Sequence, residues 1–84
     1  MKKVIVTGVT GQIGSELVRY LLENTPHQII GTVRRLSVSN HENISDIKNE
    51  RFSITPMDLS DVHSITSLIE REKPDYFINL AANS

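Results

Sequence analysis

The apolar residues of this chain fall into two patterns that alternate along the sequence. Short stretches rich in apolar and β-branched residues predict parallel strands, of which the first is expected to be buried. We expect these strands at Lys3–Thr7, Gln28–Val33, Arg51–Thr55 and Asp75–Leu80. Between them, apolar residues recur at helical spacing and predict two helices. The first covers Gln12–Asn24, and the second begins after an N-cap at Ser60 or Asp61 and ends before Pro74.

Each predicted helix carries one apolar face. That face consists of Ile13, Leu17, Val18, Leu21 and Leu22 in the first helix, and of Val62, Ile65, Leu68 and Ile69 in the second. We expect both faces, and also Tyr20 and Tyr76, to be buried or half-buried. The stretch from Arg34 to Arg51 is polar, and its helical signal is confined to a short helix at 43–48.

The order of these elements predicts an α/β fold. Strands that alternate with helices form a parallel sheet with right-handed crossovers. A Rossmann-type, doubly wound domain normally has two such halves, and this chain supplies about one. A chain of 84 residues makes one domain at most. We therefore interpret residues 1–84 as the N-terminal part, about half, of a dinucleotide-binding Rossmann domain, with the substrate-binding part outside this chain.

Composition narrows the classes of function. The formal net charge is −1 and 38% of the residues are hydrophobic, so we expect neither a nucleic-acid partner nor a membrane protein. The chain has no cysteine, which fits a reducing compartment, and we expect a cytoplasmic protein. The histidines, His27, His41 and His63, are too scattered along the sequence to indicate a metal site.

Candidate chemistry begins where the first predicted strand ends. Gly8, Gly11 and Gly14 are spaced three residues apart between that strand and the first helix. Gly8 permits the turn out of the strand, Gly11 lets a pyrophosphate approach the backbone, and Gly14 lets the helix pack closely on the sheet. The helix N-terminus adds free N–H donors and a partial positive charge. We predict a dinucleotide pyrophosphate site; the alternative is a structural turn in a domain that binds no nucleotide.

The end of the second predicted strand indicates which dinucleotide is bound. An NAD-binding domain carries an acidic residue about 20 positions past the glycines, where it accepts hydrogen bonds from the adenosine ribose. This chain has Arg34 and Arg35 there, and no Asp or Glu between Gln28 and Asn40. Guanidinium groups bind a 2′-phosphate in a bidentate way, so we predict NADP over NAD. The alternative is a solvated pair of surface arginines.

Two further strand ends carry candidate residues. Asp58 and Leu59 follow the third strand, where the carboxylate could accept from the adenine amino group while Leu59 packs on the ring. The alternative, equally weighted, is that Asp58 caps a turn or the next helix. Leu80, Ala81 and Ala82 end the fourth strand, and such small residues leave room for a ligand in the crevice there, or else simply pack closely.

Four blocks of sequence together resemble a known family. They are T-G-V-T-G-Q-I-G, V-R-R, M-D-L and K-P-D-Y-F-I-N-L-A-A-N-S, in chain order. These blocks resemble the extended short-chain dehydrogenase/reductases, also called the NAD-dependent epimerase/dehydratase family, whose glycine spacing is G-x-x-G-x-x-G. Within it the chain is most similar to the GDP-mannose 4,6-dehydratases. It departs from them at Ile13, where an aspartate is usual, and at Asn83, where glutamine or methionine is usual.

The resemblance implies a set of cofactor-binding residues within this chain. After Gly8, the pyrophosphate turn would comprise Val9, Thr10, Gly11, Gln12, Ile13 and Gly14. Arg34 and Arg35 would hold the 2′-phosphate of NADP, and Asp58 and Leu59 would flank the adenine. The residues that line the cofactor toward its nicotinamide would be Leu80, Ala81, Ala82 and Ser84.

The resemblance also implies a lyase activity. GDP-mannose would lose a hydride from C4, water would leave across C5 and C6, and the hydride would return to C6, giving GDP-4-dehydro-6-deoxy-mannose. The catalytic Ser or Thr, Glu and Tyr-x-x-x-Lys of such enzymes would lie beyond Ser84, so we expect no catalytic residue in this chain. The enzymes are homodimers or homotetramers. The alternatives are a GDP-sugar 4-reductase or sugar-nucleotide epimerase of the same superfamily, or a non-enzymatic NADP-sensing domain.

Overall fold

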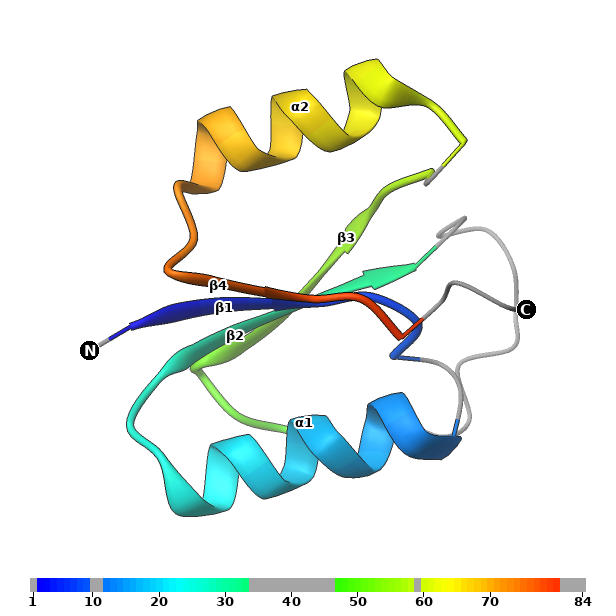
Figure 1. Ribbon diagram of the computed structural model, residues 1–84. Helices are drawn as coiled ribbons and strands as arrows, with labels where there is room; N and C mark the ends of the chain where they lie inside the picture. Colours follow the sequence, from blue (N-terminus) through cyan, green and yellow to red (C-terminus); the bar gives the residue numbers. More distant parts are fainter. Residues whose placement is uncertain (1, 10–11, 34–46, 59, 81–84) are drawn as a thin grey trace.

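Four strands and two helices follow one another in a computed structural model of the chain, which describes residues 2–9, 12–33, 47–58 and 60–80 (Figure 1). The elements are β1 (Lys3–Val6), α1 (Gln12–Asn24), β2 (Gln28–Val33), β3 (Phe52–Pro56), α2 (Val62–Glu72) and β4 (Tyr76–Ile78). Each lies where the apolar pattern predicts it, with ends that differ by two residues or fewer. The predicted helix at 43–48 falls largely outside the described residues; its last two, Ile47 and Lys48, are not helical.

The strands form one parallel sheet in the order β3-β2-β1-β4. The chain moves one way along the sheet from β1 to β3 and then crosses back to place β4 on the other side of β1. Right-handed crossovers in opposite directions put their helices on opposite faces. Accordingly, α1 covers one face and α2 the other (Figure 1). This is the arrangement of a Rossmann-type half-domain, and it confirms the predicted α/β class.

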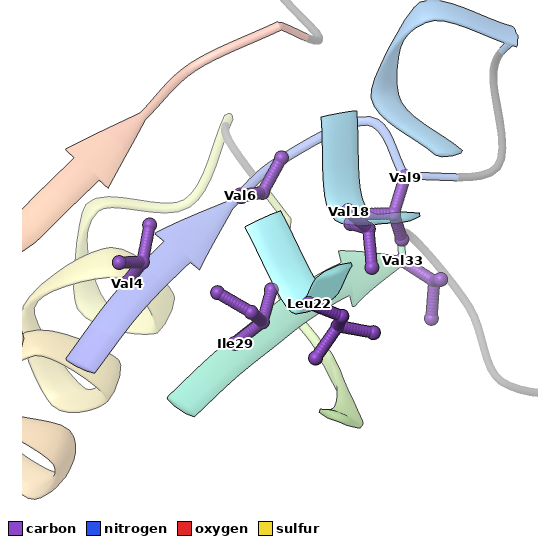
Figure 2. Close-up of a cluster of buried hydrophobic side chains, with 7 residues drawn as sticks. All are labelled: Val4, Val6, Val9, Val18, Leu22, Ile29 and Val33. Carbon is purple, nitrogen blue, oxygen red and sulfur yellow. The ribbon is translucent and has the colours of Figure 1, made fainter. Parts of the chain in front are cut away.

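The core has two layers, one on each face of the sheet. On the α1 side, a cluster comprises Val4, Val6, Val9, Val18, Leu22, Ile29 and Val33 (Figure 2). On the α2 side, the buried residues are Ile5, Ile30, Met57 and Leu68. Val4 and Val6 therefore face α1 while Ile5 between them faces α2, because side chains alternate along a strand. A central strand buried on both faces explains the unbroken apolar run that predicted it.

The predicted burial is wrong for part of each helix face. Ile13 and Val62 are 72% and 73% exposed, and Ile69 is exposed as well. At about 100° per residue, Ile13 lies about 180° around α1 from Leu22, which packs on the sheet. Tyr20 lies about two turns after Ile13 on the same side of α1 and is 61% exposed. Tyr76 lies on the edge strand β4 and is 53% exposed. Neither side chain is buried or half-buried, contrary to our expectation.

The ends of α2 are set by its neighbours in sequence. The Asp61 carboxylate accepts a hydrogen bond from the His63 N–H at 3.0 Å, which identifies Asp61 as the N-cap. At the other end, Lys73 adopts a left-handed conformation with φ of 48°, and its N–H donates to the Ile69 carbonyl. The helix thus ends just before Pro74, as predicted.

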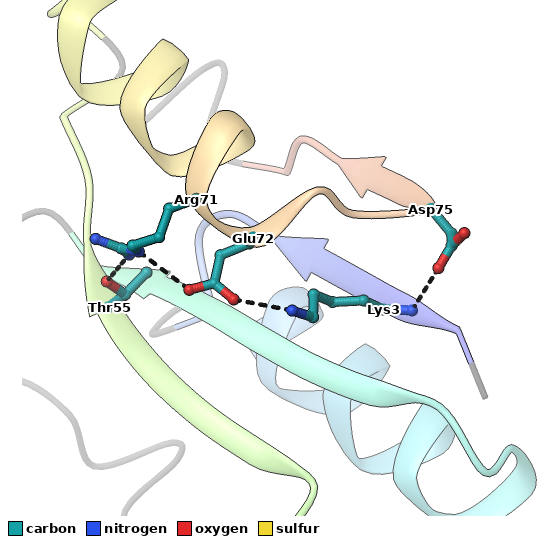
Figure 3. A network of polar contacts seen from close by, with 5 residues as sticks. All are labelled: Lys3, Thr55, Arg71, Glu72 and Asp75. Carbon is teal, nitrogen blue, oxygen red and sulfur yellow. Dashed lines mark hydrogen bonds and ion pairs between the residues drawn. The ribbon is translucent and has the colours of Figure 1, made fainter.

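A polar network joins α2 to the sheet on the side away from α1 (Figure 3). Lys3 Nζ and Arg71 Nε each lie 3.1 Å from a different carboxylate oxygen of Glu72. Arg71 also donates to Thr55 Oγ1, and the Lys3 backbone N–H donates to the Asp75 carboxylate. These contacts connect the last turn of α2 with β1 and β3, near the amino end of β1.

We expect this network to weaken in acid. Hydrogen bonds from Lys3 and then Arg71 hold the pKa of Glu72 below its ordinary value. A lowered folded-state pKa contributes stability that is complete above the unfolded-state pKa and lost as the pH falls through the folded-state pKa. Glu72→Gln should therefore cost about 0.2–1 kcal/mol at pH 7 and flatten the fall in stability below about pH 4.3.

Urea unfolding between pH 2.5 and 7 measures this dependence. Glu70→Gln is the matched control, because Glu70 is an exposed glutamate on the same helix. If the Glu72→Gln variant loses as much stability in acid as the parent protein, Glu72 does not contribute to that loss. The same conclusion follows if Glu70→Gln flattens the loss as much as Glu72→Gln does.

Candidate functional site

The turn that follows β1 begins at the carboxyl edge of the sheet. Gly8 has φ of 71°, in the left-handed region that residues with a Cβ rarely adopt. The chain then reaches the first turn of α1 at Gln12, with Thr10 and Gly11 outside the described residues. A strand, a left-handed glycine and a helix N-terminus therefore follow one another here, which is the geometry of an anion site.

Gly14 brings α1 against the exit of β1. A Cβ built on Gly14 would overlap the Gly8 carbonyl oxygen and would lie 2.8 Å from the Gly8 carbonyl carbon and 3.0 Å from Val9 Cα. No side chain fits in this space without moving the helix or the turn. The contact places the first turn of α1 directly beside the backbone that leaves the strand.

The N-terminus of α1 has no acidic residue in its first turn. The Ser15 hydroxyl donates back to the Gln12 carbonyl at 2.9 Å, and Ser15 itself is buried. Ile13 points to solvent. An anion at this helix end would meet N–H groups and the positive end of the helix dipole, with no carboxylate in the first turn to repel it.

Val9, the residue after Gly8, turns its side chain into the core. Its side chain is fully buried in the cluster beneath α1 (Figure 2). It lies over Gly31 of β2, where an added Cβ would come within 2.9 Å of both Val9 methyl groups. From the sequence alone, Gly31 had no role assigned to it. The available signal was a glycine inside a β-branched strand, which often marks a close approach.

Thr7 and Asn79 join β1 to β4 at the point where the strand order reverses. The buried Thr7 hydroxyl donates to Asn79 Oδ1 at 2.7 Å and accepts from the Leu80 N–H at 2.9 Å. The Thr7 N–H also donates to the Ile78 carbonyl. Leu80, a predicted site residue, lies exposed beside this junction. Ligands of open α/β sheets bind at such a switch point, yet the sequence blocks that contain Thr7 and Asn79 gave neither residue a role of its own.

Asp58 lies just beyond the carboxyl end of β3. Its Oδ1 accepts from the Ser60 N–H at 2.9 Å and from the Ser60 hydroxyl at 2.7 Å, and its own N–H donates to Ser64 Oγ. These bonds are those of a turn-capping aspartate, one of the two roles that the sequence left open. The adenine-binding role of Asp58 stays a prediction.

Most other predicted site residues lie outside the described residues: Thr10, Gly11, Arg34, Arg35, Leu59, Ala81, Ala82 and Ser84. Val33 is the residue before the arginines, and it ends β2, whose neighbour in the parallel sheet is β1. Arg34 and Arg35 therefore follow a strand that ends at the same edge as the Gly8 turn.

Elsewhere in the described residues there is a groove, but neither a metal site nor a membrane-spanning helix. Across the described ranges, no three His, Cys, Asp or Glu side chains gather as a metal site requires, and neither helix is long and apolar enough to cross a membrane. A groove of about 340 Å³ lies beside the second half of α1, away from the glycine turn. Its lining residues are Arg19, Leu22, Glu23, Ile47, Lys48 and Asn49.

Comparison with known proteins finds relatives among sugar-nucleotide dehydratases. GDP-mannose 4,6-dehydratase of Yersinia enterocolitica is 37% identical over 90 aligned positions, which cover 100% of this chain and 24% of that protein. dTDP-glucose 4,6-dehydratase of Salmonella typhimurium is 34% identical over 83 positions, covering 98% and 23%. The crystal structure of the Bordetella bronchiseptica enzyme WbmH in complex with NAD+ superposes with a TM-score of 0.80 at 27% identity, over 100% of this chain and 27% of that one.

The chain thus spans about a quarter of the length of the curated relatives it matches. The sequence profile of the family described as GDP-mannose 4,6 dehydratase matches residues 5–84, from the middle of β1 through all the elements around the glycine turn. Together with the parallel sheet and its left-handed glycine, this match means that the chain belongs to the GDP-mannose 4,6 dehydratase family of extended short-chain dehydrogenase/reductases.

Proposed function

We propose that this chain is the N-terminal, NADP-binding part of a sugar-nucleotide 4,6-dehydratase that converts GDP-mannose to GDP-4-dehydro-6-deoxy-mannose. The observation that carries the proposal is the closed geometry at the end of β1. There Gly8 turns in a left-handed conformation, and Gly14 leaves no room for a side chain beside it. Such a cradle fits a pyrophosphate held by backbone N–H groups.

Each predicted site residue has a role in this proposal. The turn from Gly8 to Gly14 would hold the pyrophosphate. Arg34 and Arg35 would hold the 2′-phosphate, and Asp58 with Leu59 would flank the adenine. The residues proposed on the nicotinamide side are Leu80, Ala81, Ala82 and Ser84. Leu80 follows the Thr7–Asn79 junction at the switch point, which supports that placement.

The chain's own residues bind and orient rather than catalyse. NADP, when bound, would supply the acceptor and donor of the hydride that leaves and returns to the sugar. These 84 residues contain no Tyr-x-x-x-Lys, because neither Tyr20 nor Tyr76 has a lysine four positions later. The family's catalytic residues are that motif together with a Ser or Thr and a Glu. We propose that they lie beyond Ser84, and that the enzyme forms homodimers or homotetramers in the cytoplasm.

An assay of the full-length gene product with GDP-mannose and no added reductant tests the activity. We expect a 4-keto, 6-deoxy product to accumulate without net consumption of cofactor. A parallel reaction with dTDP-glucose is the second arm, because a dTDP-glucose 4,6-dehydratase is 34% identical to this chain. Turnover of dTDP-glucose alone would overturn the proposed substrate, and turnover of neither would favour a reductase, an epimerase or a sensor.

The choice of NADP makes a separate prediction about Arg34 and Arg35. Replacing both with alanine should remove charge-assisted hydrogen bonds to the 2′-phosphate and weaken NADPH binding about 10–100-fold. NADH lacks that phosphate, so its affinity should change less than about threefold. Fluorescence titration of the wild type, the double variant and Arg71→Ala, an arginine of the α2 network, measures this. Wild-type protein that binds NADH as tightly as NADPH would contradict the prediction.

A further inference from the structure

Val9 is unusual among turn residues because its side chain is fully buried. It packs in the cluster beneath α1 near Val18 and Val33, while its backbone continues the turn that begins at Gly8 (Figure 2). The side chain therefore anchors the turn to the sheet. The position of the turn depends on how deeply that anchor can enter the core.

The Val9 side chain packs against Gly31. Gly31 lies inside β2, paired with Val6 on one side and Ile54 on the other. Ile29 and Val33, two positions away in each direction, belong to the cluster beneath α1, so position 31 faces the same way. A glycine weakens the interior of a strand, and here its missing side chain is the space that Val9 fills.

The fit between Val9 and Gly31 is tight on both methyl groups. A Cβ at position 31 would lie 2.9 Å from Val9 Cγ1 and 2.9 Å from Cγ2, and 3.1 Å from the Phe52 ring. Carbon atoms in favourable contact lie about 3.5–4.0 Å apart. Rotating Val9 does not relieve the overlap, because each staggered rotamer leaves a methyl group in at least one of the two occupied positions. The turn or β2 would have to shift.

We propose that Gly31 is a positioning residue for the dinucleotide: it sets the depth of Val9 and thereby the position of the Gly8 turn over the sheet. This role rests on the proposed function, in which that turn holds the pyrophosphate. Gly31 itself does not touch the ligand. It acts through Val9, so its effect on binding should depend on the size of the side chain at position 9.

A size-swap experiment on the full-length gene product tests this role. Gly31→Ala should raise the dissociation constant for NADPH about tenfold or more, because the turn is displaced. Val9→Ala removes both methyl groups that the new Cβ would meet. The double variant should therefore bind NADPH within about threefold of Val9→Ala alone. The matched control is Gly31→Ala with Val4→Ala, which shortens a valine of the same cluster at the far end of β1 and should not restore binding.

Urea unfolding of each variant separates positioning from loss of folding. A purely structural role would lower the folded fraction and leave the dissociation constant of the folded protein unchanged. Wild-type affinity in Gly31→Ala, failure of Val9→Ala to restore it, or equal restoration by Val4→Ala would each overturn the proposal. A wild type that binds neither NADPH nor NADH would instead contradict the proposed function. Any coupling between positions 9 and 31 in the free energy of unfolding would then reflect packing alone, and the positioning role would be overturned as well.

Discussion

Gly14→Ala is expected to destabilise the fold by about 3 kcal/mol or more and to remove measurable cofactor binding from the protein that still folds. The new Cβ would overlap the Gly8 carbonyl oxygen and crowd its carbonyl carbon at 2.8 Å. Both atoms are backbone atoms of Gly8, in the turn that leaves β1, so no side-chain rotation can relieve the overlap. Either the first turn of α1 or the Gly8 turn must therefore shift, and the proposed phosphate cradle opens.

Urea unfolding and NADPH titration measure the two parts of this result. Glu16→Ala is the control, because Glu16 is exposed on the same helix and its loss should change stability by no more than about 0.5 kcal/mol. If Gly14→Ala unfolds at the same urea concentration as Glu16→Ala and retains wild-type affinity, the packing argument is wrong.

Arg51→Ala is expected to cost about 2–4 kcal/mol, the second largest effect. The half-buried guanidinium donates from Nη1 to the carbonyls of Thr25 and His27, at 2.6 and 2.9 Å, and from Nη2 to the Leu22 carbonyl. These carbonyls lie at the C-terminal end of α1 and in the connection to β2. The last turn of α1 has no basic residue of its own, so Arg51, at the entry to β3, supplies the cation that this helix end lacks.

Two substitutions separate geometry from charge at position 51. Arg51→Lys keeps the charge and loses the planar fork, so it should recover only part of the lost stability. Arg71→Ala is the control, because that arginine is exposed, pairs with Glu72, and should cost less than about 1 kcal/mol. Equal losses in Arg51→Ala and Arg71→Ala would show that the three carbonyl contacts contribute nothing.

The elements of this fold were predictable because their signals are local. Each strand coincides with a short stretch rich in apolar residues, and α1 was predicted with both of its ends because the glycine turn precedes it and Asn24, Thr25 and Pro26 end it. The strand–helix order then restricted the sheet to parallel pairing. The glycine turn could be read in the same way, since its spacing and its neighbours lie within one short segment.

The burial of helix faces was not predictable in full. Ile13 and Val62 belong to helical repeats of apolar residues, yet both lie on the solvent side of their helices. Hydrophobic spacing shows that a helix has an apolar side; which residues on it meet the sheet depends on how the helix rotates as it packs. Asp58 was left open for a similar reason, because only the three-dimensional positions of Ser60 and Ser64 showed which groups it contacts.

By itself, the sequence determined the family, the α/β class and the location of the candidate phosphate turn, since all three depend on contiguous patterns. Only the tertiary structure revealed that Gly31 makes room for Val9, that Thr7 bonds to Asn79, and that Arg51 caps α1. Each of these contacts joins residues far apart along the chain. Their meeting depends on the register of the sheet and the packing of α1, which no local pattern of residues specifies.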